Sequence, residues 1–450
     1  MYKLSRFNYY THNLQGDLLL YNSYIGVQSM LKIPAQLVEY YEPFFQQEKD
    51  LQELSEKQLE VFSQHGIIVP EEEDELAKLK LVRYNVVNSR ILSLIILTTG
   101  QCNFRCVYCY ESFKDGEMSL ETQESIIEFV KKNIGRYSAL QVGWFGGEPL
   151  CGMGPLKNLS EAFLEICRKQ GKPYVANITT NGYLLTLPVV RQLKKWHVLS
   201  YQITIDGLED THNRQKPLAG GGKTFERVIA NLEAIRDHEK SKMLAFTIRT
   251  NISREIKAQI KEYQRFYGQR FGGDSRFKYL FRPVMDLGGE RVHDFADSML
   301  EAHDFFESIF EIVSDPADGL LPISTSNFQP GNAVCYAAKA GHFVFDPKGN
   351  ILKCTCNLDD CDPNTIGSVL TDRQWHIDTS KYAAWLNEPH ECEKTCFFAP
   401  VCLGESCPAA RVIQGIEREA CPREKRNMRG AILMADTHNQ LFQVPEELML

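Results

Sequence analysis

Three cysteines on one short stretch, Cys102, Cys106 and Cys109, are the residues of this 450-residue sequence best suited to chemistry. They are spaced CxxxCxxC and directly follow an apolar run, residues 91–97, that predicts a β-strand. Iron–sulfur clusters are usually held by four thiolates. Three thiolates on one loop would hold a [4Fe–4S] cluster by three corners, and the fourth iron would stay free to bind another molecule.

Zinc is the alternative occupant of this loop. A structural zinc ion usually takes four ligands, often as two short CxxC-like pairs, but this loop has three thiols and no second pair nearby. A catalytic zinc ion can use three protein ligands, although three thiolates are not the usual set. The spacing therefore favours an iron–sulfur cluster.

The cysteine loop resembles the signature of the radical S-adenosylmethionine (SAM) superfamily, including the aromatic Tyr108 just before the third cysteine. A glycine-rich turn after a second apolar run adds to the resemblance. Glycines let a ligand approach the backbone closely, and a carboxylate suits a ligand amino group. The turn, which resembles the family's motif for the SAM amino group, comprises Gly146, Gly147, Glu148 and Pro149.

Further positions carry over from the same resemblance. Thr180 and Asn181 resemble the segment that contacts the SAM ribose, although a plain polar turn would use the same residue types. Arg249 and Asn251 end a later strand and resemble positions that approach the SAM carboxylate and ribose. Asp206 ends the fourth predicted strand and is a geometric candidate for a catalytic base.

The resemblance implies a mechanism as well as a set of ligands. SAM would chelate the free iron, and one electron from the cluster would cleave a C–S bond of SAM to give a 5′-deoxyadenosyl radical. Cluster potentials reach down to roughly −700 mV, so such an electron is accessible. It would come from a low-potential donor protein of the flavodoxin or ferredoxin type.

Nine of the fourteen cysteines fall between Cys335 and Cys421, and such clustering favours metal over disulfides. Their order resembles the SPASM extension of radical SAM enzymes, which carries two auxiliary [4Fe–4S] clusters, although two gaps are one residue longer than usual. Three alternatives stay open for the fourth ligand of the proximal cluster: Cys356, Cys361, or no protein ligand at all. The resemblance assigns Cys392, Cys396, Cys402 and Cys421 to the distal cluster, and Cys335, Cys354 and Cys407 to the proximal one.

The spacing of apolar residues predicts an α/β fold. Between residues 90 and 310, apolar runs alternate with helical patterns, and repeated βα units imply a parallel sheet covered by helices. Six units favour a partial (β/α)6 barrel whose ligand site lies at the C-terminal ends of the strands. The predicted strands are residues 92–97, 140–145, 174–178, 200–205, 244–248 and 277–281.

Two other regions flank the predicted barrel, giving domains at 1–88, 89–315 and 316–450. The first predicts strands at 6–11, 17–22 and 24–31 and then helices at 36–46 and 53–65, the order of a winged-helix-like module. In peptide-modifying members of the family such a module captures a leader peptide as an added strand. An N-terminal cap packed on the barrel is the alternative. The last domain is the Cys-rich SPASM domain.

The composition of the sequence argues against some classes of binding partner. The formal net charge is −8, so nothing indicates the clustered positive charge of a nucleic-acid-binding protein. No apolar run is long enough to span a membrane, and no signal peptide is evident at the start. We therefore expect a cytoplasmic protein with neither nucleic acid nor membrane as a partner.

These observations predict a peptide maturase that forms a cysteine thioether crosslink in a ribosomally made precursor peptide with a leader. It would carry three [4Fe–4S] clusters and SAM. Carbon–carbon crosslinking and oxidation of serine or cysteine to formylglycine are close alternatives. A non-catalytic iron–sulfur electron carrier explains the cysteines, but neither the glycine-rich turn nor the six βα units, and a zinc scaffold is a third option.

Overall fold

The computed structural model divides into two compact units. The barrel unit comprises residues 89–323 and 341–385, and the terminal unit comprises residues 1–88, 324–340 and 386–450. Each unit is therefore assembled from segments that lie far apart in the sequence. The structure describes residues 1–113, 115–287, 290–301, 304–305, 328–356, 358, 362–370, 375–416, 421–426, 428–437 and 441–444.

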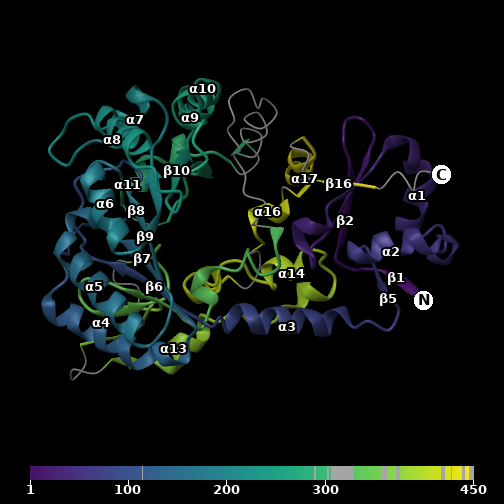
Figure 1. The fold of residues 1–450 in the computed structure, drawn as a ribbon, viewed down its shortest axis with the longest axis horizontal. Helices are drawn as coiled ribbons and strands as arrows, with labels where there is room; N and C mark the ends of the chain where they lie inside the picture. The colour runs from purple at the N-terminus through teal and green to yellow at the C-terminus, as the bar shows by residue number, and fades with distance from the viewer. Residues whose placement is uncertain are drawn as a thin grey trace. The chain divides into compact units, whose positions relative to one another are not determined.

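The barrel unit is built on a ten-stranded sheet of order β11-β10-β9-β8-β7-β6-β12-β13-β14-β15. β6 to β11 follow one another across the sheet, and each adjacent pair is parallel (Figure 1). The α/β fold and all six predicted strands are confirmed. They are β6 (Ile91–Leu97), β7 (Ala139–Phe145), β8 (Tyr174–Thr180), β9 (Val198–Thr204), β10 (Ala245–Ile252) and β11 (Phe277–Pro283).

Alternation of side chains sets the two faces of this sheet. On β7, Leu140, Val142 and Trp144 are buried, whereas Gln141 between them is exposed. The buried face packs against helices, which lie to the left of the strands in Figure 1. The described helices of the unit are α4 (Leu120–Asn133), α5 (Met153–Lys169), α6 (Leu187–Lys195), α7 (Glu209–Gln215), α8 (Phe225–His238), α9 (Arg254–Ala258), α10 (Ile260–Phe271), α11 (Glu290–Asp294) and α13 (Thr379–Ala384).

A segment from the predicted SPASM domain extends the barrel sheet. β12 (His342–Phe345) pairs in parallel with β6, and β13 (Asn350–Leu352), β14 (Thr365–Ser368) and β15 (His376–Ile377) continue as antiparallel neighbours. β12 is not among the predicted strands, because a four-residue strand has no usable periodicity and is buried by pairing with a strand about 250 residues earlier.

The terminal unit contains a four-stranded sheet of order β16-β4-β3-β2. The predicted strand over residues 24–31 is wrong. Gly26–Ser29 forms a 3-10 turn that starts with a φ of +83° at Gly26, so the third strand begins only afterwards. The strands are β2 (Asn8–His12), β3 (Leu18–Asn22), β4 (Leu31–Ile33) and β16 (Phe442–Gln443), with β1 (Tyr2–Leu4) and β5 (Ile68–Pro70) forming a separate antiparallel pair.

Helices follow the N-terminal strands in the predicted order. Asp74 caps the third helix by accepting hydrogen bonds from the backbone N–H groups of Leu76 and Ala77. The described helices of the unit are α1 (Ala35–Phe45), α2 (Glu56–Gln64), α3 (Glu75–Val87), α14 (Ala399–Cys402), α15 (Ala409–Val412), α16 (Arg423–Arg426) and α17 (Met428–Thr437). The assignment to the winged-helix class stays a prediction.

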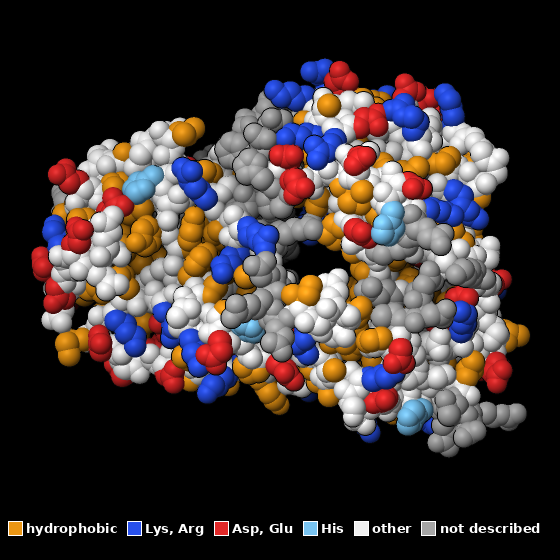
Figure 2. Space-filling model, turned by 180° about the vertical axis from the view of Figure 1, so that it is seen from behind, with side chains coloured by type: hydrophobic (Ala, Val, Ile, Leu, Met, Phe, Trp, Pro, Cys, Tyr) orange, Lys and Arg blue, Asp and Glu red, His pale blue; other side chains and the backbone are white. Residues whose placement is uncertain are grey.

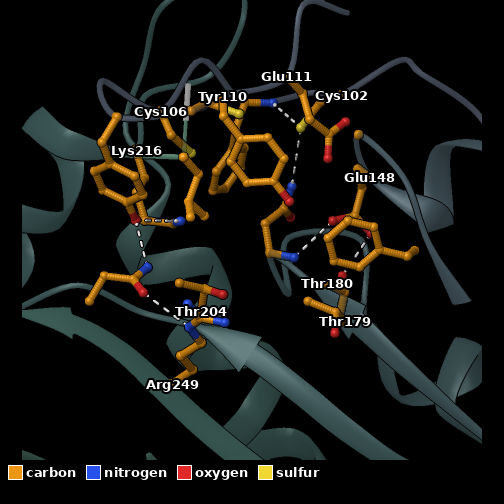
Figure 3. A pocket seen from close by; sticks show the side chains of 18 of the residues that line it. Cys102, Cys106, Tyr110, Glu111, Glu148, Thr179, Thr180, Thr204, Lys216 and Arg249 are labelled. Carbon is orange, nitrogen blue, oxygen red and sulfur yellow. Dashed lines mark hydrogen bonds between the residues drawn. The ribbon is translucent and has the colours of Figure 1, made fainter. Parts of the chain in front are cut away.

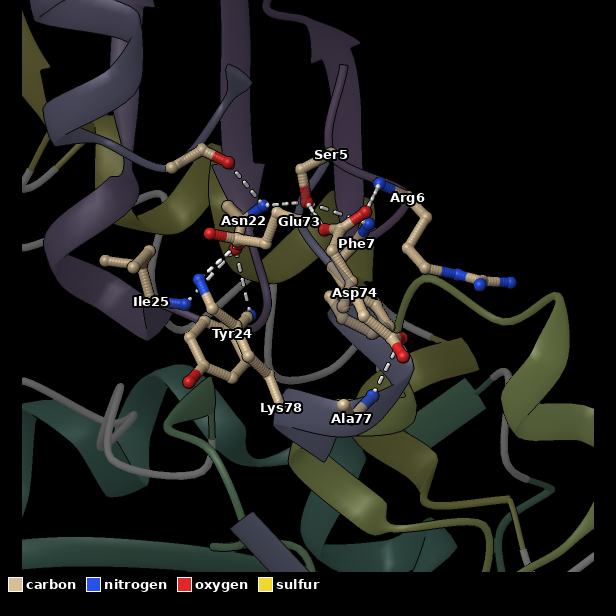
Figure 4. Close-up of polar contacts among 12 residues, drawn as sticks. Ser5, Arg6, Phe7, Asn22, Tyr24, Ile25, Glu73, Asp74, Ala77 and Lys78 are labelled. Carbon is tan, nitrogen blue, oxygen red and sulfur yellow. Dashed lines mark hydrogen bonds and ion pairs between the residues drawn. The ribbon is translucent and has the colours of Figure 1, made fainter. Parts of the chain in front are cut away.

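The buried carboxylate of Glu75, at the start of α3, accepts hydrogen bonds from the connection between the first two strands. Figure 4 shows Ser5, Arg6 and Asn22 in this network. The Ser5 hydroxyl donates to Glu75 Oε1 at 2.5 Å, and the Arg6 backbone N–H donates to Glu75 Oε2 at 3.1 Å. Asn22 from β3 joins the network by donating to Ser5 Oγ at 2.8 Å. Strand and helix are therefore held by charge-assisted hydrogen bonds in addition to apolar packing.

Acidic and basic side chains are interspersed over the face shown in Figure 2, in keeping with the small net charge. Within the described part of the chain, every helix is too short or too polar to cross a membrane.

Candidate functional site

The C-terminal ends of the barrel strands surround a cavity of about 1000 Å³, counting its mouth to solvent (Figure 3). This is the edge at which a partial barrel was expected to bind its ligand. The cavity brings together nearly all of the predicted SAM and cluster residues. Its wall includes Cys102, Cys106, Tyr108, Cys109, Gly146, Gly147, Glu148, Thr180, Asn181, Arg249 and Asn251, but not Pro149 or Asp206.

The three thiols of the loop gather on one side of this cavity. Burial raises the pKa of Cys102 well above its usual range, raises that of Cys106, and raises that of Cys109 to about 12. The proximity of Cys106 adds to the rise in pKa at both Cys102 and Cys109, and Cys109 adds to the rise at Cys102. Free thiolates are therefore disfavoured here, and bound iron would supply the positive charge that deprotonates them.

Two glycines allow the β7 turn to approach the cysteine loop. Gly146 has a φ of +127°, and a Cβ there would overlap the carbonyl oxygen of Thr99. At Gly147 a Cβ would overlap the carbonyl oxygen of Gln101, directly before Cys102. The backbone hydrogen bond from Glu148 N to Gln101 O, at 2.9 Å, requires this close approach. The glycines thus bring the turn and the loop together, which a side chain would prevent.

Glu148 connects two strand ends through its buried carboxylate. It accepts hydrogen bonds from the Thr180 hydroxyl at 2.7 Å and from the Asn181 backbone N–H at 2.8 Å. Burial raises the pKa of Glu148, and these hydrogen bonds oppose that rise. The Asn181 side chain donates to Asn103 Oδ1 at 2.7 Å, so the same residue also reaches the cysteine loop. Figure 3 shows Glu148 and Thr180 pointing toward each other.

Asp206 is fully buried behind the cavity wall. Its Oδ1 accepts the Asn251 backbone N–H at 2.8 Å, and its Oδ2 accepts the Tyr108 hydroxyl. Lys216 Nζ lies 3.8 Å from Oδ2 and donates to the Tyr108 hydroxyl at 3.3 Å. The carboxylate predicted as a catalytic base is therefore engaged on both oxygens by protein groups.

Lys216 is the functional residue that sequence reasoning missed. Burial alone would lower the pKa of its ammonium, but Cys106, Tyr108 and Asp206 together outweigh burial and raise that pKa well above its ordinary value. Lys216 lies more than one hundred residues from the cysteine loop and belongs to no motif. Local spacing therefore gave no signal that it reaches this cavity.

The four cysteines assigned to the distal cluster come together in the terminal unit. Burial raises the pKa of Cys402 to about 12, and Cys396, Cys392 and Cys421 each add to the rise. The Lys425 ammonium lies 3.9 Å from Cys421 Sγ. Four grouped thiols are the ligand set that an iron–sulfur cluster usually requires.

The cysteines assigned to the proximal cluster divide between the two units. Cys335 and Cys407 lie in the terminal unit, where the Cys335 backbone N–H donates to Ser406 O at 3.0 Å. Cys354 and Cys356 lie in the barrel unit, and Cys361 falls outside the described residues. Among the described residues, no three His, Cys, Asp or Glu side chains converge as ligands of a single metal ion would. This does not argue against a cubane cluster, because such a cluster binds its thiolates at separate corners and not at a single point.

Comparison with known proteins assigns part of the chain to a known class of domain. The fold is similar to that of anSMEcpe with bound AdoMet and Cp18Cys peptide, with a TM-score of 0.59 and 18% identity over 78% of this chain and 98% of that chain. Residues 96–266 match the model of the Radical SAM superfamily. The chain therefore contains a radical SAM domain over these residues. Such a domain implies a [4Fe–4S] cluster and SAM, which the three cavity thiols and the adjoining space fit.

Curated relatives match the chain only in part. It is 26% identical over 164 residues to the Fe-coproporphyrin III synthase of Methanosarcina barkeri, which is 36% of this chain and 38% of that protein. It is 29% identical over 145 residues to a probable GTP 3′,8-cyclase of Methanocella arvoryzae, which is 32% of this chain and 43% of that protein. The chain spans about two fifths of the length of these relatives.

Proposed function

We propose that this enzyme modifies a ribosomally made precursor peptide and forms a thioether crosslink from a peptide cysteine. The radical SAM domain supplies the reaction class. The inner face of the barrel supports a peptide as the substrate, and the four grouped cysteines of the terminal unit support an auxiliary cluster. The SPASM assignment, the leader-binding role of residues 1–88 and the low-potential electron donor belong to the same proposal.

The main support for a peptide substrate comes from the inner face of the barrel. A second cavity there is lined by uncharged residues of β7 to β10, and Thr179 lines both this cavity and the SAM cavity. Within the described structure the Asn177 and Gln141 side chains make no hydrogen bond, so their amide groups are available to a ligand's main-chain amides. The polar lining residues are Gln141, Asn177, Thr179, Ser200, Gln202 and Thr247.

This chemistry suits a peptide better than a nucleoside triphosphate such as GTP, which a relative's name indicates as its substrate. A triphosphate requires several cations around it. Lys278, opposite Thr247 in the register of β10 and β11, is the one basic residue that the register sets beside this lining, counting only described residues. An uncharged stretch of peptide matches such a wall.

The residues of the SAM cavity have separate tasks in this proposal. Glu148 would bind the SAM amino group, and Thr180 and Asn181, which donate hydrogen bonds to Glu148, would bind the ribose. Arg249, whose Nε donates to Asn251 Oδ1 at 3.0 Å, would bind the SAM carboxylate. When bound, the cluster and SAM would supply the radical chemistry needed to remove a hydrogen atom from a substrate carbon.

The overall peptide reaction is a two-electron oxidation. One C–H bond and one S–H bond break, and one C–S bond forms. One hydrogen atom would leave in 5′-deoxyadenosine, the thiol proton would pass to solvent, and a bound iron–sulfur cluster would be needed to accept the remaining electron. The product is therefore lighter than the substrate by two hydrogens.

The proposal is tested with the reconstituted, reduced enzyme, SAM and a Cys-containing precursor peptide encoded beside the gene. We expect a mass loss of about 2 Da, and the crosslinked cysteine should no longer react with iodoacetamide. The Cys102→Ser variant is the control for radical chemistry. An unchanged peptide mass argues against peptide oxidation, a carbon–carbon link in tandem mass spectra argues against the thioether, and an aldehyde that reacts with hydrazide indicates formylglycine.

A further inference from the structure

A segment after α7 pairs with the cysteine loop along its backbone. Val107 N donates to Gln215 O at 3.0 Å, Arg105 N donates to Pro217 O at 2.9 Å, and Ala219 N donates to Asn103 O at 2.8 Å. These bonds run in antiparallel register. Residue 216 therefore lies directly opposite residue 106, and side chains of directly opposed residues are neighbours.

The register places a cation, Lys216, beside the cysteine Cys106. Both side chains line the SAM cavity, and Figure 3 shows them on the same side of it. The Lys216 side chain is only 5% exposed. It is held by the Tyr108 hydroxyl at 3.3 Å and lies 3.8 Å from Asp206 Oδ2. A buried ammonium needs such a carboxylate partner to remain charged.

Asp206 is the counter-ion of this cation. Its side chain is 0% exposed, and the Asn251 N–H and the Tyr108 hydroxyl occupy its two oxygens. It does not line the cavity in which a substrate would meet the radical. The geometry therefore fits a charge-balancing role for Asp206 better than the role of a base that takes a substrate proton.

We propose that Lys216 and Asp206 form a buried ion pair that sets the reduction potential of the cluster held by the cysteine loop. Reduction adds negative charge to a cluster, and nearby charges, hydrogen bonds and solvent exposure tune cluster potentials. A cation next to Cys106 favours the reduced state, and the anion behind it moderates that effect. Lys216 acts on the cluster indirectly, through the cysteine loop, so it is a positioning residue and not a catalytic one. The inference rests on the radical SAM domain within the proposed function and not on the peptide substrate.

Removal of the cation and removal of the anion should shift the reduction potential in opposite directions. In Lys216→Gln the anion stays without its cation, so the cluster becomes harder to reduce and its potential shifts to more negative values. In Asp206→Asn the cation stays alone, so the potential shifts to more positive values. We expect about a tenfold change in the reduction equilibrium each way, which is about 59 mV for one electron. The double variant should return close to the wild type.

The experiment is a redox titration of the reconstituted full-length protein followed by electron paramagnetic resonance. The signal that changes on adding SAM identifies the cluster of the cysteine loop among any others. Lys223→Gln is the matched control, because Lys223 lies on the same connection but is exposed and pairs with Glu209 at 3.0 Å. Its potential should equal that of the wild type.

The outcomes separate this inference from the proposed function. Potentials that do not move in the single variants, or that move in the same direction, overturn it even if the peptide is modified. If Lys216→Gln fails to hold iron, Lys216→Arg decides: recovery of iron and of the wild-type potential supports the role of the charge, and no recovery overturns it. A wild-type protein without any SAM-sensitive signal refutes the cluster assignment and, with it, this inference.

Discussion

At the scale of single residues, the SAM cavity depends on groups that each make several contacts. Glu148 holds Thr180 and Asn181, and Asn181 reaches Asn103 on the cysteine loop. A change at one residue should therefore disturb the positions of its partners as well. Charge-assisted hydrogen bonds of this kind contribute about 1.5–3 kcal/mol each.

Replacing Cys102 by serine tests the cluster assignment most directly. The Cys102→Ser variant should bind about four fewer irons and four fewer sulfides than the reconstituted wild type. It should also form no 5′-deoxyadenosine from SAM under reducing conditions. Cys151→Ser is the control, because Cys151 is exposed and outside the cavity wall. Full iron content together with SAM cleavage in Cys102→Ser would contradict the assignment.

The Glu148→Gln substitution tests the SAM-binding turn. The amide keeps the shape of the carboxylate but loses its charge, so the hydrogen bonds from Thr180 and Asn181 weaken. We expect the Kd for SAM, measured by equilibrium dialysis, to rise at least about tenfold, which corresponds to about 1.4 kcal/mol. Glu165→Gln on the exposed side of α5 should leave the Kd unchanged. Equal affinities in both variants would exclude a role for Glu148 in binding SAM.

At the scale of elements, short contacts join segments that are far apart in the sequence. In the terminal unit, Glu75 at the start of α3 fastens the β1–β2 connection, and Lys32 on β4 lies between Asp17 at 2.8 Å and Asp436 at 3.0 Å. Neither contact follows from the local periodicity of the elements it joins. Both can be tested separately from catalysis.

Loss of the Glu75 carboxylate should loosen the first strand. In Glu75→Ala the Ser5 hydroxyl and the Arg6 N–H lose their buried acceptor, which costs about 2 kcal/mol of local stability. Hydrogen exchange followed by mass spectrometry should show faster exchange in peptides that cover residues 1–12 and 74–87. The exposed Glu60→Ala on α2 serves as the control. Unchanged exchange in Glu75→Ala would show that pairing with β5 and apolar packing hold β1 without this carboxylate.

The Asp17 pair predicts a dependence on pH. Burial raises the pKa of Asp17, but hydrogen bonds from Lys32, Asn13 and the Ala35 N–H outweigh it, and the net pKa is lowered. Because the folded pKa lies below the unfolded value, the contribution to stability is complete above about pH 4 and is lost as pH falls through the folded pKa.

Wild type and Asp17→Asn should therefore differ by up to about 1 kcal/mol in the free energy of unfolding of this unit at pH 7. The difference should shrink below about pH 4. Hydrogen exchange in residues 17–33, compared at pH values between 3 and 7 after correction for intrinsic rates, measures it. A difference that stays constant down to pH 3 would contradict the shift.

At the scale of the whole molecule, each compact unit holds its own group of clustered cysteines. The barrel unit holds the cysteine loop, and the terminal unit holds Cys392, Cys396, Cys402 and Cys421. If each group binds a cluster, removal of one should leave the other in place.

Iron analysis of Cys402→Ser tests this independence. The wild type should bind about twelve irons if all three proposed clusters assemble, and the variant about eight. SAM should still perturb the resonance signal of the remaining loop cluster. Loss of all iron would mean that the units do not bind clusters separately, and an unchanged iron content would remove Cys402 from the ligand set.

The sequence by itself determined the local features: the cysteine loop, the glycine-rich turn and the six βα units. Each is encoded within a short window by spacing, glycine content or alternation of apolar residues, so no distant contact is needed to find it. Only the tertiary structure decided that Lys216 lies opposite Cys106, that Asp206 is enclosed by Tyr108 and Asn251, and that residues 342–345 extend the barrel sheet. These arrangements depend on pairing between distant, short segments, and such segments carry too little local pattern to specify their partners.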